Sequence, residues 1–369
     1  MRVPFSFLTE QFANPEPIFD RIREFLKRCD FTLGEDLAVF EGRYAEYCGA
    51  KHAIGVGTGT DAIFLSLKAL GVQPGDEVLT APNSFIATTG AIVQAGAKPV
   101  YVDVNETMDI DVEKIERAIT DKTRAIVPVH WGGNPCDIET VLKIAKQHQL
   151  VVVEDACQAL GAKVSGKAVG SWGDAGAFST HPLKPLHVWG DGGMIVTNSD
   201  SLASQLRLLR NHGLAGRDEV SVYGYNSRFD NLQAIVGNVV MDSLDATIDK
   251  RIAHAERYDK ALGERKFSGG VRVPKRDTNK KHVFHLYQIY AQNRDGLLKH
   301  LNHHGIEAKV HYPTPLHLQP AAQAWGYREG SFPLTENQSA FTITLPCHQY
   351  LNIEQIDFVI SKISDFYGL

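Results

Sequence analysis

Cysteine is scarce in this chain, and its arrangement suits neither metal binding nor cross-linking. The 369 residues include five cysteines (Cys29, Cys48, Cys136, Cys157 and Cys347), an odd number that contains no C-x-x-C pair. Structural zinc sites and disulfide frameworks usually show close or even-numbered cysteines. We therefore expect no metal site and no disulfide framework.

Long apolar runs and strong net charge are also lacking. No run approaches the ~18–20 apolar residues that cross a bilayer, and the start MRVPFSFLTEQF does not resemble a signal peptide. The formal net charge of −5 gives no reason to expect a nucleic-acid partner. With 43% hydrophobic and 22% charged residues, the composition is that of a globular enzyme. We expect a cytoplasmic protein that acts on small molecules, without a membrane partner.

Strands alternate with helices in the first two thirds of the chain. Apolar runs at 53–56, 77–80, 98–102, 124–129 and 150–153 predict strands, and segments with helical periodicity lie between them. This alternation predicts an α/β fold whose central sheet is mostly parallel and covered on both faces.

The pattern changes after about residue 245. Residues 223–247 end in a long helical pattern, and 265–279 is charged without periodicity. Beyond it we expect a strand from His282, a helix at 297–304, a strand at 308–310 and a helix at 353–366. We predict a large domain over 1–250, with an N-terminal helical segment, and a smaller α+β domain over 251–369.

An acid and a lysine stand out between residues 151 and 197. The apolar run at 151–153 predicts a buried strand that ends in Glu154 and Asp155. Lys184 follows the next apolar run in a loop rich in glycine and proline, where a solvated lysine gains little. A Schiff-base lysine needs an aldehyde cofactor, and pyridoxal 5'-phosphate needs a carboxylate at its ring nitrogen. We therefore predict Lys184 and Asp155 as catalytic residues that act with this cofactor.

A glycine-rich turn at 57–61 (GTGTD) lies between a predicted strand and a predicted helix. Backbone N–H groups at such a helix start can bind a phosphate. The simpler interpretation is a tight turn that Thr60 or Asp61 caps. A dinucleotide site needs an acid at the far end of the next strand, whereas Asp76 and Glu77 precede or open it. The dinucleotide interpretation is therefore disfavoured.

Other residues have two interpretations each. Phe85 could stack on a cofactor ring, although an aromatic residue at a helix start is more often core. Gln158 could contact a ring hydroxyl, and Ser179 could bind a phosphate or simply end its strand. Arg228 suits a carboxylate or phosphate, but its polar surroundings also suit an ion-pair interface.

Eight motifs occur together over essentially the whole chain. They are GTGTDA (57–62), PNSFIATTGAI (82–92), VEDACQALGA (153–162), GDAGAFST-HPLK (173–184), GDGGMIVT (190–197), LRNHG (209–213), GYNSRFDNLQA (224–234) and HYPTPLHLQP (311–320). Jointly they make the chain resemble the DegT–StrS group of sugar aminotransferases. That resemblance implies fold type I, the aspartate aminotransferase fold, with pyridoxal phosphate as cofactor.

The resemblance also implies a role for each candidate residue. Lys184 would hold the cofactor aldehyde, and Asp155 would pair with the ring nitrogen. The other expected cofactor contacts are Gly59, Thr60, Asp61, Phe85, Gln158, Ser179 and Asn226. Asn226 would reach the phosphate in the neighbouring subunit, which implies a homodimer with shared sites. The expected substrate contacts are Arg228, His181, His187, His311 and Tyr312.

The implied reaction moves an amino group from glutamate to an oxo-sugar. A nucleotide-linked keto-deoxysugar is the main expectation, in polysaccharide, lipopolysaccharide or amino-sugar biosynthesis. Relatives usually carry an aromatic residue at the position of His181 and often Asn-Leu-Gly after the lysine, where this chain has 185–189 (PLHVW). These departures keep a non-nucleotide acceptor open, such as an 8-oxo-3-deoxy-octulosonate or a keto-inositol. A sugar dehydratase and a non-catalytic regulator that binds the cofactor are further alternatives, but the dehydratase branch replaces the lysine that is present here.

Overall fold

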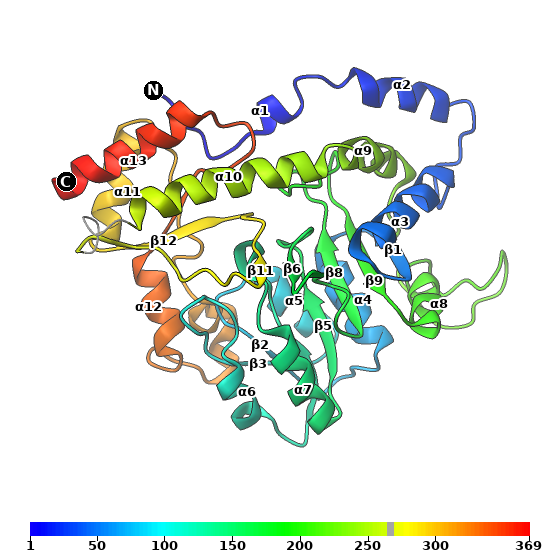
Figure 1. Cartoon of the computed structure of the whole chain (residues 1–369). Helices are drawn as coiled ribbons and strands as arrows, with labels where there is room; N and C mark the ends of the chain where they lie inside the picture. Colours follow the sequence, from blue (N-terminus) through cyan, green and yellow to red (C-terminus); the bar gives the residue numbers. More distant parts are fainter. Residues whose placement is uncertain (264–268) are drawn as a thin grey trace.

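A seven-stranded sheet forms the centre of the computed structural model, which describes residues 1–263 and 269–369 (Figure 1). The strand order is β1-β9-β8-β5-β4-β2-β3. The strands are β1 (His52–Val56), β2 (Glu77–Thr80), β3 (Lys98–Tyr101), β4 (Thr123–Val127), β5 (Val151–Asp155), β8 (Ala175–Ser179) and β9 (Gly193–Thr197). All of them run in one direction except β9, which is antiparallel to both neighbours. The predicted α/β fold with a mostly parallel sheet is confirmed.

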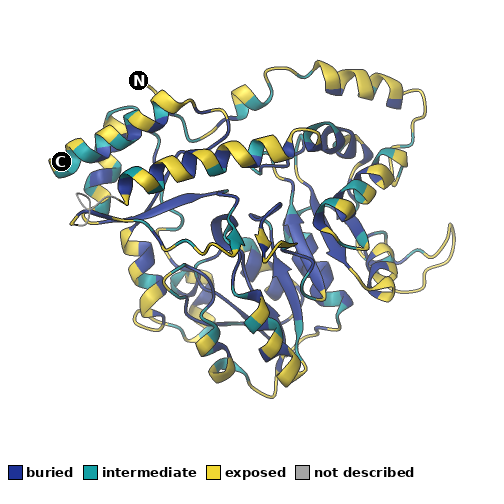
Figure 2. Ribbon diagram, in the orientation of Figure 1, coloured by how far each residue is buried: buried dark blue, intermediate teal, exposed yellow. Residues whose placement is uncertain are grey.

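Two apolar layers cover the two faces of this sheet. Successive strand residues alternate between the layers, so Val152 packs into one and Val153 into the other. One layer is covered by α4 (Gly59–Ala69), α5 (Ile86–Gln94) and α8 (Asp200–Leu209). The other is covered by α3 (Glu35–Cys48), α6 (Val112–Ala118), α7 (Ile138–His148) and α9 (Asn231–Met241). Figure 2 shows the buried strands between helices whose outer faces are exposed.

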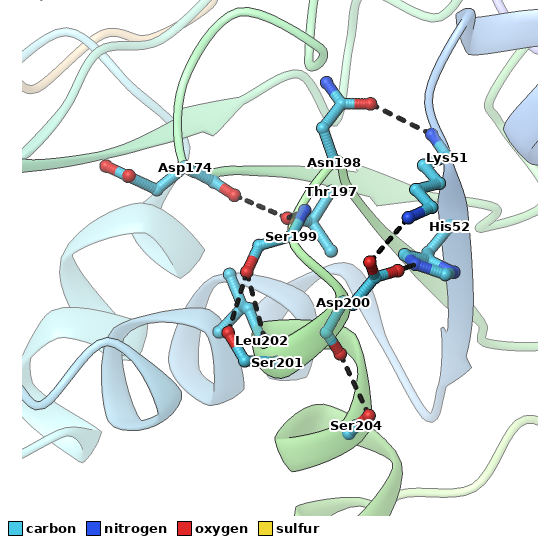
Figure 3. Close-up of polar contacts among 10 residues, drawn as sticks. All are labelled: Lys51, His52, Asp174, Thr197, Asn198, Ser199, Asp200, Ser201, Leu202 and Ser204. Atoms are coloured by element: carbon cyan, nitrogen blue, oxygen red, sulfur yellow. Dashed lines mark hydrogen bonds and ion pairs between the residues drawn. The ribbon is translucent and has the colours of Figure 1, made fainter.

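The common direction of the strands places the site. The turns after β1, β2, β5 and β8 all leave the sheet at its carboxyl edge. In parallel α/β sheets this edge is where ligands bind. At the opposite edge β9 ends at Thr197, Ser199 caps α8, and Asp200 contacts Lys51 and His52 at the start of β1 (Figure 3). These contacts fix the antiparallel pair β1–β9.

A second layer system follows helix α10 (Leu244–Leu262), which extends away from the main sheet (Figure 1). It contains an antiparallel sheet of β10 (Val271–Arg272), β12 (Tyr287–Ala291) and β13 (Thr342–Leu345). Helices α11 (Arg294–His303) and α13 (Ile353–Tyr367) share its core. The helix α10 is continuous through residue 250, and the predicted division into two domains there stays a prediction.

The described chain also contains shorter elements. They include α1 (Leu8–Gln11), α2 (Glu16–Phe25), α12 (Pro333–Phe341) and a small sheet of β6 (Lys163–Val164), β7 (Lys167–Ala168) and β11 (Lys280–Lys281). Val3 pairs with Ile306, which holds the N-terminal segment against the C-terminal part of the chain. In the part that the structure describes, no helix is long and apolar enough to cross a membrane.

The C-terminal third departs most from the predicted elements. The long helical pattern at 223–247 is two helices, because the backbone leaves helical geometry at Ser243. The predicted strand at 308–310 is wrong: Lys309 makes a single bridge to Thr344. The strand expected from His282 starts only at Tyr287, because the preceding residues bond to the backbone of a turn at 132–133. Four residues of the charged segment, 265–268, lie outside the described residues.

We predict that Phe40→Ala destabilises the fold strongly. Phe40 is fully buried on α3, and its ring centroid lies 5.7 Å from that of Tyr44 and 5.5 Å from that of Phe229. Removing a buried phenyl ring costs about 3–5 kcal/mol of unfolding free energy. Denaturant unfolding measures this loss. The matched control is Val39→Ala, because Val39 is 49% exposed on the same helix and should change stability by less than about 0.5 kcal/mol. Equal losses in the two variants would contradict the packing described here.

Candidate active site

A cavity of about 730 Å³ opens at the carboxyl edge of the main sheet. Its walls come from the turns after β1, β2, β5 and β8, and from segments near both ends of the chain. The predicted site residues that line it are Gly59, Thr60, Phe85, Asp155, Gln158, Ser179, His181, Lys184, His311 and Tyr312. Residues from five separated motifs thus meet in one place.

Asp155 ends β5 with a carboxylate that the protein holds at both oxygens. Asp155 is only 5% exposed, and its Oδ2 accepts a hydrogen bond from Thr88 Oγ1 at 2.7 Å. Its Oδ1 accepts a bond from the Cys157 N–H at 3.1 Å. Ser84 Oγ lies 2.6 Å from Thr88 Oγ1 and continues the network. A buried carboxylate needs such donors, and they fix the direction in which it faces the cavity.

Lys184 lies partly exposed in the loop after β8. Its backbone N–H donates to His181 O at 2.8 Å, which gives the loop a tight turn. Its amine makes no hydrogen bond or ion pair within residues 1–263 and 269–369. Burial lowers the pKa of this amine, and the nearby Cys157 and Asp155 only partly oppose the shift. A lowered amine pKa raises the neutral, nucleophilic fraction that attack on an aldehyde requires.

The turn at 57–61 begins α4, and its cap differs from the prediction. Thr58 is the N-cap, since its Oγ1 accepts a bond from Asp61 N–H at 2.9 Å, so the prediction of Thr60 or Asp61 is wrong. The N–H groups of Gly59 and Thr60 lie in the first turn, where no intrahelical acceptor exists. A Cβ on Gly59 would lie 2.7 Å from Ser179 Cβ. Only glycine allows this approach between the turn and β8.

Asp61 does not line the cavity. Its Oδ2 accepts a hydrogen bond from Ser227 Oγ at 2.9 Å, and the same hydroxyl accepts one from Gly57 N–H at 3.1 Å. The structure therefore places Asp61 behind the turn, where it joins the GYNSR motif to the helix start. This position supports the turn but offers no direct contact with a ligand in the cavity.

Phe85 and Gln158 face the cavity with groups that remain available. Phe85 is 51% exposed, and its ring centroid lies 5.9 Å from that of Tyr312, so the core interpretation of Phe85 is wrong. Gln158 accepts a hydrogen bond from Gly132 N–H at 2.8 Å through Oε1. This bond fixes the amide orientation and leaves the amide nitrogen as a donor.

Besides Asp61, three further predicted residues do not line this cavity within one chain. His187 is buried, and its ring centroid lies 5.7 Å from that of Phe12, so it packs under the N-terminal segment. Asn226 is exposed on the surface. Arg228 is half-buried, and its Nη1 donates to Asn211 Oδ1 at 2.9 Å.

The wall opposite the sheet edge was not predicted. It is formed by Phe5, Ser6, Phe7, Leu8, Arg251, His285, Glu307, Lys309, Leu345, Cys347 and His348. The ring of Phe5 stacks on that of His311 at a centroid distance of 5.6 Å. Burial, together with the charges of Lys309 and Lys184, lowers the pKa of His311 to about 4, so this ring is neutral at neutral pH. Long-range pairing of the N-terminal segment creates this wall, and no local motif signals it.

The residues of the cavity fit pyridoxal phosphate. One wall offers an amine without a partner at Lys184 and a fixed carboxylate at Asp155. Free N–H groups at the start of α4 and the hydroxyl of Ser179 suit a phosphate. The exposed ring of Phe85 suits the face of a pyridine ring. In the described ranges 1–263 and 269–369, no group of three or more His, Cys, Asp or Glu side chains could hold a metal ion.

Comparisons with known proteins agree with this chemistry. The model of the DegT/DnrJ/EryC1/StrS aminotransferase family matches residues 14–364. A "Pleiotropic regulatory protein" of Geobacillus stearothermophilus is 44% identical, over 100% of this chain and 99% of that protein. The dTDP-3-amino-3,4,6-trideoxy-alpha-D-glucose transaminase of Streptomyces venezuelae is 36% identical, over 99% of this chain and 96% of that protein. The structure of ntda from Bacillus subtilis with bound cofactor PMP superposes with a TM-score of 0.93 at 33% identity, over 100% of this chain and 86% of that chain.

The buried His187 should make stability depend on pH. Burial lowers its pKa from 6.5 to about 4, and the charge of Arg251 contributes. Between pH 6.5 and 4, this ring is protonated in the unfolded chain but neutral in the folded chain. Stability should therefore fall as the pH decreases from 6.5 to 4, by up to about 1.4 kcal/mol per pH unit.

We predict that His187→Gln flattens this dependence when denaturant unfolding is measured between pH 4 and 7. The control is His303→Gln, because His303 is exposed on α11 and should leave the slope unchanged. An unchanged slope in His187→Gln would show that the ring takes up its proton in the folded state.

Proposed function

The chain belongs to the DegT/DnrJ/EryC1/StrS aminotransferase family and is a transaminase that uses pyridoxal phosphate, and we propose that it aminates a nucleotide-linked oxo-sugar. The meeting of Lys184 and Asp155 in one cavity carries the proposal. The cavity is large enough for a cofactor together with a substrate. The activity of the Streptomyces relative supports a nucleotide-linked sugar as the acceptor class.

Two residues act at the reacting atoms in this proposal. Pyridoxal phosphate, when bound, supplies an aldehyde and an electron-withdrawing ring. Lys184 would hold the aldehyde, and its amine would move a proton to and from the donor carbon. Asp155 keeps the ring nitrogen protonated, and Thr88 and the Cys157 N–H keep Asp155 in position. The donor is glutamate in this proposal, and the acceptor receives the amino group in the second half of the cycle.

The remaining residues bind and orient. Gly59, Thr60 and Ser179 would hold the phosphate, as their free donors and close packing support. Phe85 would cover one face of the ring, and the Gln158 amide nitrogen would donate to the ring hydroxyl. His181, His311 and Tyr312 line the space left for substrate. The departures of this loop from the family pattern keep a non-nucleotide oxo-sugar as the second acceptor class.

The spectrum of the purified protein tests the role of Lys184. We predict a visible absorption band. Reduction with labelled borohydride should remove this band and leave the label covalently attached at Lys184. Lys184→Ala should abolish turnover, while the exposed Lys167→Ala should keep both band and turnover. A protein that stays colourless with added cofactor would contradict the role of Lys184. A screen of keto-sugars against the aminated form then identifies the acceptor, because an aminated product carries nitrogen and a dehydration product does not.

We propose a homodimer in which Asn226 completes the partner's phosphate site. Asn226 is exposed and does not line the cavity of its own chain. Thr32 pairs with Asp230, which brings the exposed side chains of Phe31 (48%) and Leu33 (38%) beside this motif. An exposed apolar patch next to a polar binding motif suits a subunit interface.

Complementation tests the shared site. We predict that Asn226→Asp binds the cofactor poorly, because its charge opposes a phosphate. Mixing the Asn226→Asp and Lys184→Ala variants should restore activity. One of the two sites in the mixed dimer then contains Lys184 from one chain and Asn226 from the other. Native mass spectrometry confirms subunit exchange first. Exchange without any gain over the separate variants would show that Asn226 acts within its own chain or not at all.

A further inference from the structure

Four buried polar atoms on or near helix α10 have no hydrogen-bond partner within residues 1–263 and 269–369. They are Arg251 Nη2 and the Nδ1 atoms of His254, His285 and His348, and we call these four residues the Arg251 cluster. Arg251, His285 and His348 line the same cavity as Lys184. Buried polar groups nearly always have hydrogen-bond partners in folded proteins. Several neighbouring residues with unpartnered nitrogen atoms therefore point to a ligand.

The Arg251 guanidinium has no counter-charge in the part of the chain that the structure describes. Its Nε donates to Gln349 Oε1 at 3.0 Å, and its Nη1 donates to the carbonyls of Phe284 at 3.3 Å and His285 at 3.4 Å. Within the described residues no carboxylate lies at ion-pair distance from it, although Arg251 is only 2% exposed. A buried cation without an anion is costly, and burial accordingly lowers the pKa of Arg251 to about 10.

The neighbouring histidines cannot share this positive charge. Burial lowers the pKa of His254, His285 and His348, and the charge of Arg251 lowers each further. His348 reaches a pKa of about 4 and uses Nε2 to bond Pro4 O at 3.0 Å. At neutral pH the Arg251 cluster therefore contains one cation, Arg251, among neutral histidine rings. The free Nη2 of Arg251 could donate to one acidic group.

The number of free donors limits the kind of anion that Arg251 can bind. The guanidinium carbon lies 5.3 Å from the ring centroid of Phe7, and Leu345 and Cys347 add apolar wall. Only Nη2 is uncommitted, and it is shielded from solvent. A diphosphate needs several donors, whereas a carboxylate needs one or two. The ligand must reach Nη2 by displacing a wall side chain, and the Phe7 ring is the one that covers the guanidinium.

We propose that Arg251 binds a carboxylate of the amino-acid donor. This rests on the proposed transaminase site, because the donor must bring its amino group to Lys184 in the same cavity. Lys184, Arg251 and His285 all line this cavity. Arg228, which the family resemblance places near the donor carboxylate or the sugar substrate, bonds Asn211 through Nη1 and does not line the cavity.

The experiment compares Arg251→Met and Arg251→Lys with Arg257→Met in the cofactor-loaded protein. Arg257 is the matched control, because it lies on the same helix but is exposed and pairs with Asp357. Maleate, an unreactive dicarboxylate, is the probe for calorimetric titration. We expect Arg251→Met to weaken maleate binding by about 10- to 100-fold, Arg251→Lys by less, and Arg257→Met not at all.

The half-reactions separate this proposal from the proposed function. L-Glutamate, L-alanine and the amino-sugar product are each mixed with loaded protein while the cofactor absorbance is followed. Arg251→Met should slow conversion by glutamate but keep conversion by the amino-sugar. A selective loss with glutamate assigns the side-chain carboxylate, and an equal loss with alanine assigns the α-carboxylate. Equal loss with the amino-sugar, or none with glutamate, would overturn the role of Arg251, whereas a wild type that converts with none of them would refute the transaminase site.

The wild-type protein provides a test that does not depend on a variant folding. Maleate added to protein labelled with ¹⁵N at histidine should shift the side-chain resonances of His285 and His348. The exposed His303 serves as the internal control. If ordered water satisfies the cluster instead, these resonances stay in place, and the proposal is wrong even when Arg251→Met unfolds.

Discussion

The buried carboxylate of Asp155 constrains much of the molecule around it. Removing such a charge from water is unfavourable unless fixed donors replace the solvent. Those donors are Thr88 on α5 and the N–H of Cys157, so α5 must pack beside the end of β5. The parallel strands make this possible, because β2 and β5 both end at the edge where α5 begins. The acid, its supports and the lysine loop therefore depend on one another.

Local sequence signals predicted the parts of the fold that depend on local patterns. The strand Glu77–Thr80 and the end of β5 at Asp155 follow from apolar runs bounded by polar residues, and the structure shows them there. Placing Lys184 and Asp155 at one edge follows from strand direction alone. The cap of α4 was missed because Thr58, Thr60 and Asp61 are all good caps, and only the observed geometry of Thr58 distinguishes them.

Features that depend on distant pairing could not be read from the sequence. The segment at 308–310 has the pattern of a strand, yet only Lys309 finds a partner. Arg251 lies in a helix with an amphipathic sequence pattern, where an arginine is usually solvated. Among the described residues it has no counter-charge, and this depends on its burial by the N-terminal segment and His348, which are distant in sequence. Neighbouring residues of one motif also separate: Ser227 is buried against Asp61, while Asn226 faces outward.

The two walls of the cavity come from different parts of the chain. The wall that fits the cofactor consists of strand ends and helix starts, where Gly59 approaches Ser179 too closely for any side chain. The opposite wall includes segments 5–8, 307–312 and 345–348, where the ring of Phe5 stacks on that of His311. Substitutions in these segments leave the residues that fit the cofactor unchanged. For enzyme engineering, a library restricted to these segments would vary the space beside the cofactor without losing variants to failed cofactor binding.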